Sequence, residues 1–344
     1  MRRLVKKLLC TTLAVGVVLG GVACKKPVEE KPEVTNTPVA TQEPEKPTIK
    51  TIGICQYADH SALNESREGI LEALKNAGLV EGTDFVIDYQ NAGLDSAKCA
   101  TIAKDFVAKD VDVICSIATN AATACMSAAE GKDIPVIYAA VTDPEGANLT
   151  GENITGTSDE LRIDAQLKMI RELQPRATAI GIVYFTNEPN ASYAIGEYSL
   201  LGLEHGFVIR TIGVSSVDEV NRAVDTLISL GVDCFTTVSD NGTASVLASV
   251  LETANMFGFP VYGSDKGQVE MGCVASAAID YHELGLETGA MVAEVLKGET
   301  AVADMKAKTI YKYNLYINSE ALKRAAISVS DKITKTAIDV SVQE

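Results

Sequence analysis

Short polar segments follow several apolar runs of this sequence, at the point where each run ends. The run at 134–138 is followed by Thr142 and Asp143, and the run at 234–238 by Asp240 and Asn241. Hydroxyl, amide and carboxylate groups bind small polar molecules through hydrogen bonds and, where the molecule is cationic, through charge. In an open sheet of parallel strands, ligands are bound beyond the carboxyl ends of the strands. These segments are therefore candidate parts of one ligand site.

The candidate ligand-binding residues share this position, just beyond a predicted strand or in the first turn of the next helix. In the first half of the chain they are Gln56, Tyr57, His60, Ser61, Ala62, Thr119, Asn120, Thr142 and Asp143. In the second half they are Tyr184, Asn187, Glu188, Asn190, Ser192, Asp240, Asn241 and Asp265. None of them is Lys or Arg, and no glycine-rich phosphate loop follows a strand, so nucleotide and phosphate ligands are disfavoured.

The polar candidates suit the two charged groups of a free α-amino acid. Helix starts favour a carboxylate through their unpaired N–H groups and the helix dipole, and buried acids favour an ammonium group. The candidates at helix starts are Ser61, Thr119, Asn120 and Ser192, and the acids are Asp143, Glu188, Asp240 and Asp265. Each helix-start residue equally fits a simple N-cap. Tyr57 and Tyr184 could stack on an aromatic ligand or pack at strand ends.

Catalytic signatures are missing from the sequence. It contains no G-x-S-x-G, no cysteine paired with a plausible histidine, and no cluster with metal-ligand spacing. We therefore predict a binding protein that is not an enzyme and that has no cofactor and no metal. The absence of tryptophan disfavours a sugar, because carbohydrate sites often stack sugars on indole rings.

The elements that would position these residues alternate between apolar strands and amphipathic helices from Thr51 onward. This alternation predicts an α/β fold of parallel sheets flanked by helices. Strands are predicted at 52–56, 85–89, 111–117, 134–138, 179–184, 208–212, 234–238, 260–262, 274–278 and 310–317. Helices are predicted at 61–77, 95–108, 119–129, 161–173, 191–203, 217–230, 243–257 and 281–296.

Two halves of the chain resemble each other. VDV…ATN at 111–120 returns as VDC…SDN at 232–241, and IPVIY at 134–138 returns as FPVY at 259–262. The similar spacing of the two pairs predicts two similar lobes, with the segment at 153–159 leading from one lobe into the other. Residues at the ends of the strands would then face each other across a cleft.

The N-terminal residues predict export. Residues 1–7 are basic and 8–22 almost wholly apolar, which is typical of a signal peptide over 1–23. Ala23-Cys24 resembles the cleavage site of a bacterial lipoprotein, although Gly21 replaces the usual leucine-like residue, so Cys24 is a candidate for lipidation. An ordinary secreted protein is the alternative. The proline- and glutamate-rich segment at 24–50 predicts a disordered tether.

The net charge and the cysteines indicate which partners are disfavoured and whether disulfides are expected. Removing residues 1–23 takes away four of the 30 Lys and Arg and none of the 46 Asp and Glu, which leaves a net charge of −20. Such a surface argues against nucleic acid as a partner. Six cysteines remain beyond Cys24, an even number that allows disulfides. Several lie in apolar runs, so we predict reduced, structural thiols.

Several blocks together resemble one family, the substrate-binding lipoproteins of ABC transporters in the tryptophan/tyrosine-uptake group. The blocks are GICQYADHSALNESREGILEALKNAG at 53–78, VTDPEGANL at 141–149, NITGTSD at 153–159, YFTNEPNAS at 184–192, SDNGTAS at 239–245 and MGCVASAAIDYHELGLETGAMVAEVLKGE at 271–299. The resemblance covers about 51–322. It implies a type I periplasmic-binding-protein fold, in which two lobes joined by a three-crossing hinge close on a small ligand.

The resemblance also implies how the chain is divided and what it binds. One lobe would comprise 51–158 with 279–304, and the other 159–278 with 305–344. The ligand would be an aromatic or hydrophobic amino acid, with His60 contacting it, and the partner a membrane permease. We expect a monomer, anchored by lipid at the outer face of the cell membrane or periplasmic. The alternatives are a sensory lipoprotein that does not transport and a receptor for a sugar or nucleoside.

Overall fold

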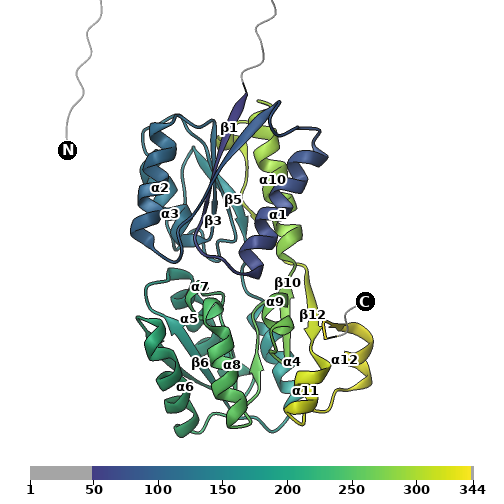
Figure 1. Cartoon of the computed structure of the whole chain (residues 1–344). Helices are drawn as coiled ribbons and strands as arrows, with labels where there is room; N and C mark the ends of the chain where they lie inside the picture. Colours follow the sequence, from purple (N-terminus) through teal and green to yellow (C-terminus); the bar gives the residue numbers. More distant parts are fainter. Residues whose placement is uncertain (1–48, 342–344) are drawn as a thin grey trace, which may run out of the picture. The chain divides into compact units, whose positions relative to one another are not determined.

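The computed structural model describes residues 49–341 (Figure 1). The predicted signal peptide, Cys24 and all but the last residues of the predicted tether lie outside this range. The tether prediction ends slightly too late, because strand β1 (Lys50–Gln56) already begins at Lys50. Within residues 49–341, no helix has both the length and the apolar character needed to cross a membrane.

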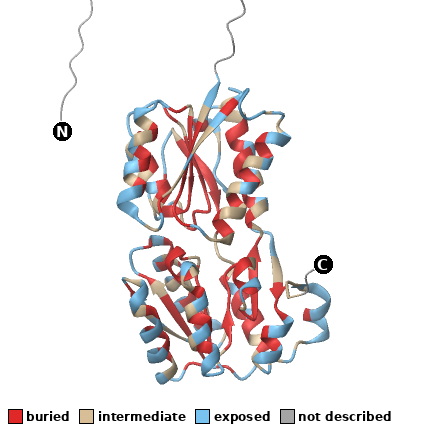
Figure 2. Cartoon of the chain, in the orientation of Figure 1, coloured by how far each residue is buried: buried red, intermediate tan, exposed pale blue. Residues whose placement is uncertain are grey.

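The first lobe is built on a parallel sheet in the strand order β2–β1–β3–β4–β5–β11. Its other strands are β2 (Phe85–Asn91), β3 (Val113–Ile117), β4 (Val136–Ala139), β5 (Ile154–Ser158) and β11 (Lys308–Thr309). Every residue of β3, β4 and β5 is buried. Continuous burial is expected of parallel strands covered on both faces, and Figure 2 shows these strands as the buried interior of the lobe.

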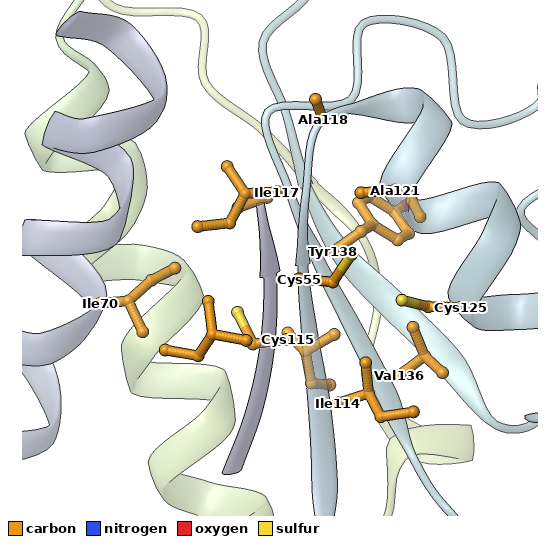
Figure 3. Packing of buried hydrophobic residues seen from close by; sticks show 14 of the residues in the cluster. Cys55, Ile70, Ile114, Cys115, Ile117, Ala118, Ala121, Cys125, Val136 and Tyr138 are labelled. Carbon is orange, nitrogen blue, oxygen red and sulfur yellow. The ribbon is translucent and has the colours of Figure 1, made fainter. Parts of the chain in front are cut away.

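Helices cover both faces of this sheet. Helices α2 (Ser96–Ala108) and α3 (Thr119–Ala129) lie on one face, and α1 (Ser61–Asn76) and α10 (Tyr281–Leu296) on the other (Figure 1). Figure 3 shows Ile70 of α1 and Cys125 of α3 pointing toward the sheet from opposite sides, with Ile114 between them. The 3₁₀ turn η2 (Val302–Asp304) leads from α10 to β11.

Helices α1 and α10 touch through their backbones. A Cβ atom on Gly285 would lie 2.1 Å from the carbonyl oxygen of Ser66, and one on Gly69 would lie 2.2 Å from that of His282. These glycines therefore allow a helix close to the C-terminus to pack directly on the first helix of the domain.

The second lobe repeats the strand order of the first. Strands β6 (Ala179–Phe185), β7 (Val208–Val214), β8 (Cys234–Thr236) and β9 (Val261–Tyr262) form a parallel sheet in the order β7–β6–β8–β9. Backbone hydrogen bonds from Val274 to Val261 and from Gly263 to Ala275 join β9 to β10 (Ala275–Ile279). The order β7–β6–β8–β9–β10 thus matches β2–β1–β3–β4–β5, as the repeated sequence segments predict.

One part of the second lobe differs from the predicted parallel sheet. Strand β12 (Tyr313–Ile317) runs antiparallel to β10 and parallel to β13 (Ile338–Asp339). The reason is that β12 enters this lobe directly from the first lobe, with no crossover helix to reverse its direction. The helices of the lobe are α4 (Ile163–Leu173), α5 (Pro189–Glu204), η1 (Val217–Glu219), α6 (Val220–Ser229), α7 (Asn241–Ser245), α8 (Leu247–Met256), α9 (Lys266–Glu270), α11 (Ser319–Arg324) and α12 (Asp331–Thr336).

The chain passes between the two lobes at 159–162, at 280 and at 310–312. The last crossing lies later than predicted. Lys308 and Thr309 of β11 pair with Thr157 and Ser158 of β5, so the chain is still in the first lobe where the sequence assigns the second from 305. A two-residue edge strand has too few positions to show a periodic pattern.

Of two further predictions, one about a helix is wrong and one about the cysteines is confirmed. The helix predicted at 243–257 is divided into α7 and α8 at Val246, whose φ of −115° is not helical. The thiol prediction is confirmed for the described residues, since all six cysteines between 49 and 341 are free and buried.

Candidate ligand-binding cleft

A cavity lies where the carboxyl ends of strands from both lobes meet. The first lobe contributes His60, Ala62, Leu63, Ala118, Thr119 and Ala140, the crossings contribute Asp159 and Tyr281, and the second lobe contributes Asn190, Ser239, Asp240, Asn241, Ala244, Asp265 and Gln268. The space open to a water-sized molecule is about 20 Å³, which is room for about one water. An organic ligand can therefore reach this cavity only if the lobes move apart.

The structure brings part of the predicted set into this cavity. The candidates that line it are His60, Ala62, Thr119, Asn190, Asp240, Asn241 and Asp265. The candidates that do not line it are Gln56, Tyr57, Ser61, Asn120, Thr142, Asp143, Tyr184, Asn187, Glu188 and Ser192.

Most of the candidates outside the cavity have partners in their own lobe. The amide of Gln56 donates to the carbonyl of Ala58 and to Asn64, and the hydroxyl of Tyr57 donates to the carbonyl of Leu94. The Ser61 hydroxyl donates to Glu65, and the Asp143 carboxylate accepts from the Gly146 N–H in a local turn. These contacts stabilise the loops that carry the cavity residues.

Backbone strain marks the wall formed by the first lobe. Ala118 at the end of β3 has φ 84°, and Ala140 after β4 has φ 54°. A positive φ on a residue with a Cβ costs of order 1 kcal/mol. Ala118 immediately precedes α3, and no side chain in the described part of the chain caps that helix. The N–H groups of its first turn are thus left without intrahelical partners at the cavity.

The wall formed by the second lobe is rich in acceptors. Asp240 accepts hydrogen bonds from the Phe185 N–H and from both the N–H and hydroxyl of Thr243. Burial, followed by the nearby charge of Glu188, raises the pKa of Asp240 to about 7. Asp265 caps α9 by accepting from the Gln268 N–H at 2.9 Å, and burial raises its pKa as well.

Asn190, which lines the cavity, has an unused hydrogen-bond acceptor. Its amide NH₂ donates to the carbonyl of Ser239, so the amide oxygen is the atom left over. This Oδ1 has no hydrogen-bond partner among residues 49–341, although the residue is only 6% exposed. A buried acceptor without a donor costs about 1–3 kcal/mol, which a ligand donor would recover.

Two residues at the lobe crossings, Asp159 and Tyr281, line the cavity although they are not among the predicted site residues. Asp159 accepts from the Thr142 hydroxyl at 2.9 Å and from the Tyr281 hydroxyl at 2.8 Å, and burial raises its pKa. The guanidinium of Arg162 also lies over the ring of Tyr311, 5.7 Å from its centre, linking the first crossing to the third. The other lining residues outside the predicted set are Leu63, Ala118, Ala140, Ser239, Ala244 and Gln268.

A usable signal for these residues exists in the sequence. Asp159 and Tyr281 lie within one or two positions of a lobe crossing, and a crossing must pass beside the cleft that it hinges. Polar residues at predicted crossings are thus candidates in their own right. Among residues 49–341, no group of three or more His, Cys, Asp or Glu side chains is placed to hold a metal ion.

This chain is similar to known proteins over most of its length. The family model for "ABC transporter substrate binding protein" matches residues 51–341. The chain is 35% identical over 280 residues to the tyrosine-binding protein of Clostridioides difficile (strain R20291), covering 80% of this chain and 80% of that protein.

Two solved structures at similar identity match to different degrees. An ABC domain from Streptococcus pneumoniae in complex with L-Trp matches with a TM-score of 0.80 at 32% identity, over 85% of this chain and 100% of that one. The ligand-free, open structure of a substrate-binding protein with adhesive properties from Clostridium difficile matches with a TM-score of 0.64 at 31% identity, over 85% and 99%. The present structure as a whole therefore superposes better on the tryptophan complex than on the open structure.

Proposed function

Because this chain belongs to the ABC transporter substrate-binding protein family, we propose that it captures a free aromatic α-amino acid outside the cytoplasm and presents it to the permease of an importer. Membership of this family makes the chain a solute-binding protein of an ABC transporter and confirms the prediction that it is not an enzyme. The identity of the solute, the lipid anchor and the permease contact are the proposed parts.

The proposal rests on the different hydrogen-bonding groups of the two cavity walls, with N–H donors on one wall and oxygen acceptors on the other. The first wall offers the uncapped start of α3 at Thr119, which favours a carboxylate. The second wall offers the free Oδ1 of Asn190 together with the acids Asp240 and Asp265, which favour an ammonium group. An α-amino acid carries both groups on one carbon atom, so it can bridge the two walls and hold the lobes together.

The remaining lining suits the side chain of such a ligand. Ala62, Leu63, Ala140 and Ala244 are small or apolar, and Tyr281 adds an aromatic ring. Small residues leave room for a large ligand side chain when the lobes separate, and an aromatic ligand would pack on Leu63 and Tyr281. The names of the relatives, a tyrosine-binding protein and an L-Trp complex, support the aromatic class.

The proposed anchor is compatible with access to the cleft. Strand β1 begins at Lys50 and ends near the cavity, so its amino end is the end of the strand far from the cavity. A lipid on Cys24 followed by a tether over 24–49 would attach the first lobe at this end. Intact-mass measurement of the membrane fraction tests the anchor, and an unmodified N-terminus would remove it from the proposal.

Thermal unfolding in the presence of candidate ligands tests the solute. The purified protein is first unfolded and refolded to remove any bound ligand, and is then screened with the twenty amino acids, a few sugars and nucleosides. A ligand at 100 times its dissociation constant adds about 2.7 kcal/mol to the free energy of unfolding, a rise of several degrees in Tm. We expect the rise with Tyr, Trp or Phe. A rise confined to sugars or nucleosides would refute the proposed ligand class.

A further inference from the structure

The two lobes meet in a direct hydrogen bond beside the cavity. His60 Nε2 lies 3.0 Å from Asn241 Oδ1. His60 immediately precedes α1 in the first lobe, and Asn241 is the first residue of α7 in the second. Both residues line the cavity, so this bond forms only when the walls are close together.

A buried carboxylate lies behind Asn241. Glu188 is 1% exposed, and its two oxygens accept hydrogen bonds from the Asn241 N–H at 2.9 Å, the Gly242 N–H at 2.7 Å and the Asn241 side-chain amide. Burial raises the pKa of Glu188, and these three donors act in the opposite direction by stabilising the charged form. With a donor on each oxygen, the ionised acceptor-only form fits the geometry.

This carboxylate decides which way the Asn241 amide faces. The amide NH₂ points to Glu188 Oε2, so the amide oxygen points across the cleft. Turning the amide by 180° would place its oxygen against the carboxylate oxygen of Glu188, and its NH₂ could then pair with His60 Nε2 only in the Nδ1–H form of the ring. Because Oδ1 can only accept, His60 must donate from Nε2.

We propose that Glu188 is a positioning residue that holds the Asn241 amide oxygen toward the cleft and thereby selects the Nε2–H form of His60 when the clamp closes. Glu188 does not line the cavity and acts through Asn241. The inference rests on the proposed function only where ligand binding is measured, because the hydrogen-bond geometry can be tested without a ligand.

Nitrogen NMR of the imidazole rings tests the positioning directly. The chain contains three histidines, so ¹⁵N-histidine labelling gives a simple spectrum in which His60→Ala assigns the signal. At about pH 8.5 we expect the Nε2–H form to dominate for His60. In Glu188→Gln the replacing amide can donate as well as accept, so the Asn241 amide can turn, and the ratio of Nε2–H to Nδ1–H should fall at least about two-fold.

Asp240→Asn is the matched control for this measurement. It removes a neighbouring buried acid whose hydrogen-bond partners are Phe185 and Thr243, so the His60 ratio should stay as in the wild type. An unchanged ratio in Glu188→Gln, or an equal fall in Asp240→Asn, would overturn the proposal. If Glu188→Gln does not fold, Asn241→Ala replaces it, and the ratio of Nε2–H to Nδ1–H must then fall to that of a free histidine side chain.

A double-mutant cycle tests whether the positioned bond matters for capture. L-tryptophan and L-tyrosine are titrated calorimetrically into the wild type, Glu188→Gln, His60→Ala and the double variant. One net hydrogen bond corresponds to a change of roughly 3–10-fold in affinity, which we expect for Glu188→Gln in the wild-type background. In the His60→Ala background the change should be below about two-fold, and an equal change in both backgrounds would refute the coupling. If neither amino acid binds the wild type, the proposed solute fails while the NMR result still decides the role of Glu188.

Discussion

The contact between α1 and α10 gives a sharp prediction about stability. A Cβ on Gly285 would lie 2.1 Å from the Ser66 carbonyl oxygen, nearly 1 Å inside the 3.0 Å that real Cβ contacts respect. The Cβ is fixed to the backbone of α10 and the oxygen belongs to the backbone of α1, so relief of the clash requires the two helices to separate. Separation would loosen the packing of buried neighbours on α10, among them Leu284 and Val292. Overpacking of this kind costs about 1–3 kcal/mol, and the better helix propensity of alanine returns at most about 1 kcal/mol. We expect Gly285→Ala to lower the free energy of unfolding by about 1–2 kcal/mol.

Gly196→Ala is the matched control, because Gly196 also lies inside a helix, α5. Apart from its chain neighbours and the backbone of its own helix, no described atom lies within 4 Å of a Cβ built there. Only the helix propensity therefore changes, and the free energy of unfolding should rise by about 0.5–1 kcal/mol. Urea unfolding followed by circular dichroism measures both, and the midpoints should move in opposite directions. Equal shifts in the two variants, or a stabilised Gly285→Ala, would refute the claim of backbone contact.

Three further predictions concern the cavity. The pKa of Asp240 is raised to about 7 from an ordinary 3.8, so this group stabilises the fold below about pH 4 and its contribution is lost as the pH rises to about 7. Subtracting the pH–stability curve of Asp240→Asn from that of the wild type should show this fall. A difference that does not vary with pH would contradict the burial argument. Asn190→Leu should weaken the binding of tyrosine or tryptophan, measured by calorimetry, by about ten-fold or more. The Tm of the ligand-free variant, measured by thermal unfolding, should stay within a few degrees of the wild type, and an unchanged affinity would exclude the free Oδ1 as a ligand acceptor. Ala118→Gly should raise the free energy of unfolding by up to about 1 kcal/mol, because glycine tolerates φ 84°, and a lower value in urea unfolding would show that this backbone is not strained.

Strong local patterns make much of the fold predictable. Helices α3 and α10 begin and end where the sequence predicts, at 119–129 and 281–296. Asp280 caps α10 by accepting from the N–H groups of His282 and Glu283, and Gly298 follows its end with φ 67°. The two-residue strand β11 and the five-residue helix α9 are too short for periodicity to indicate them.

The candidate site is predictable only in part, for a related reason. Thr119, Asp240 and Asp265 can be found because each follows a strand whose carboxyl end must point to the cleft. Asp159 and Tyr281 are hydrogen-bonded although they are 122 positions apart, and only the convergence of two crossings brings them together. Glu188 follows a strand as predicted, yet the structure places it behind Asn241 rather than at the cavity.

The exchange of segments between the lobes also has a consequence for biosynthesis. The first sheet is complete only when β11 at 308–309 has been made, and α1 obtains its partner only when α10 at 281–296 has been made. The second lobe in turn waits for β12 and β13, which end at Asp339. During N- to C-terminal synthesis neither lobe can finish folding early, because both depend on contacts that are distant in sequence. A chain with this topology cannot complete either lobe until almost all of it has emerged from the ribosome.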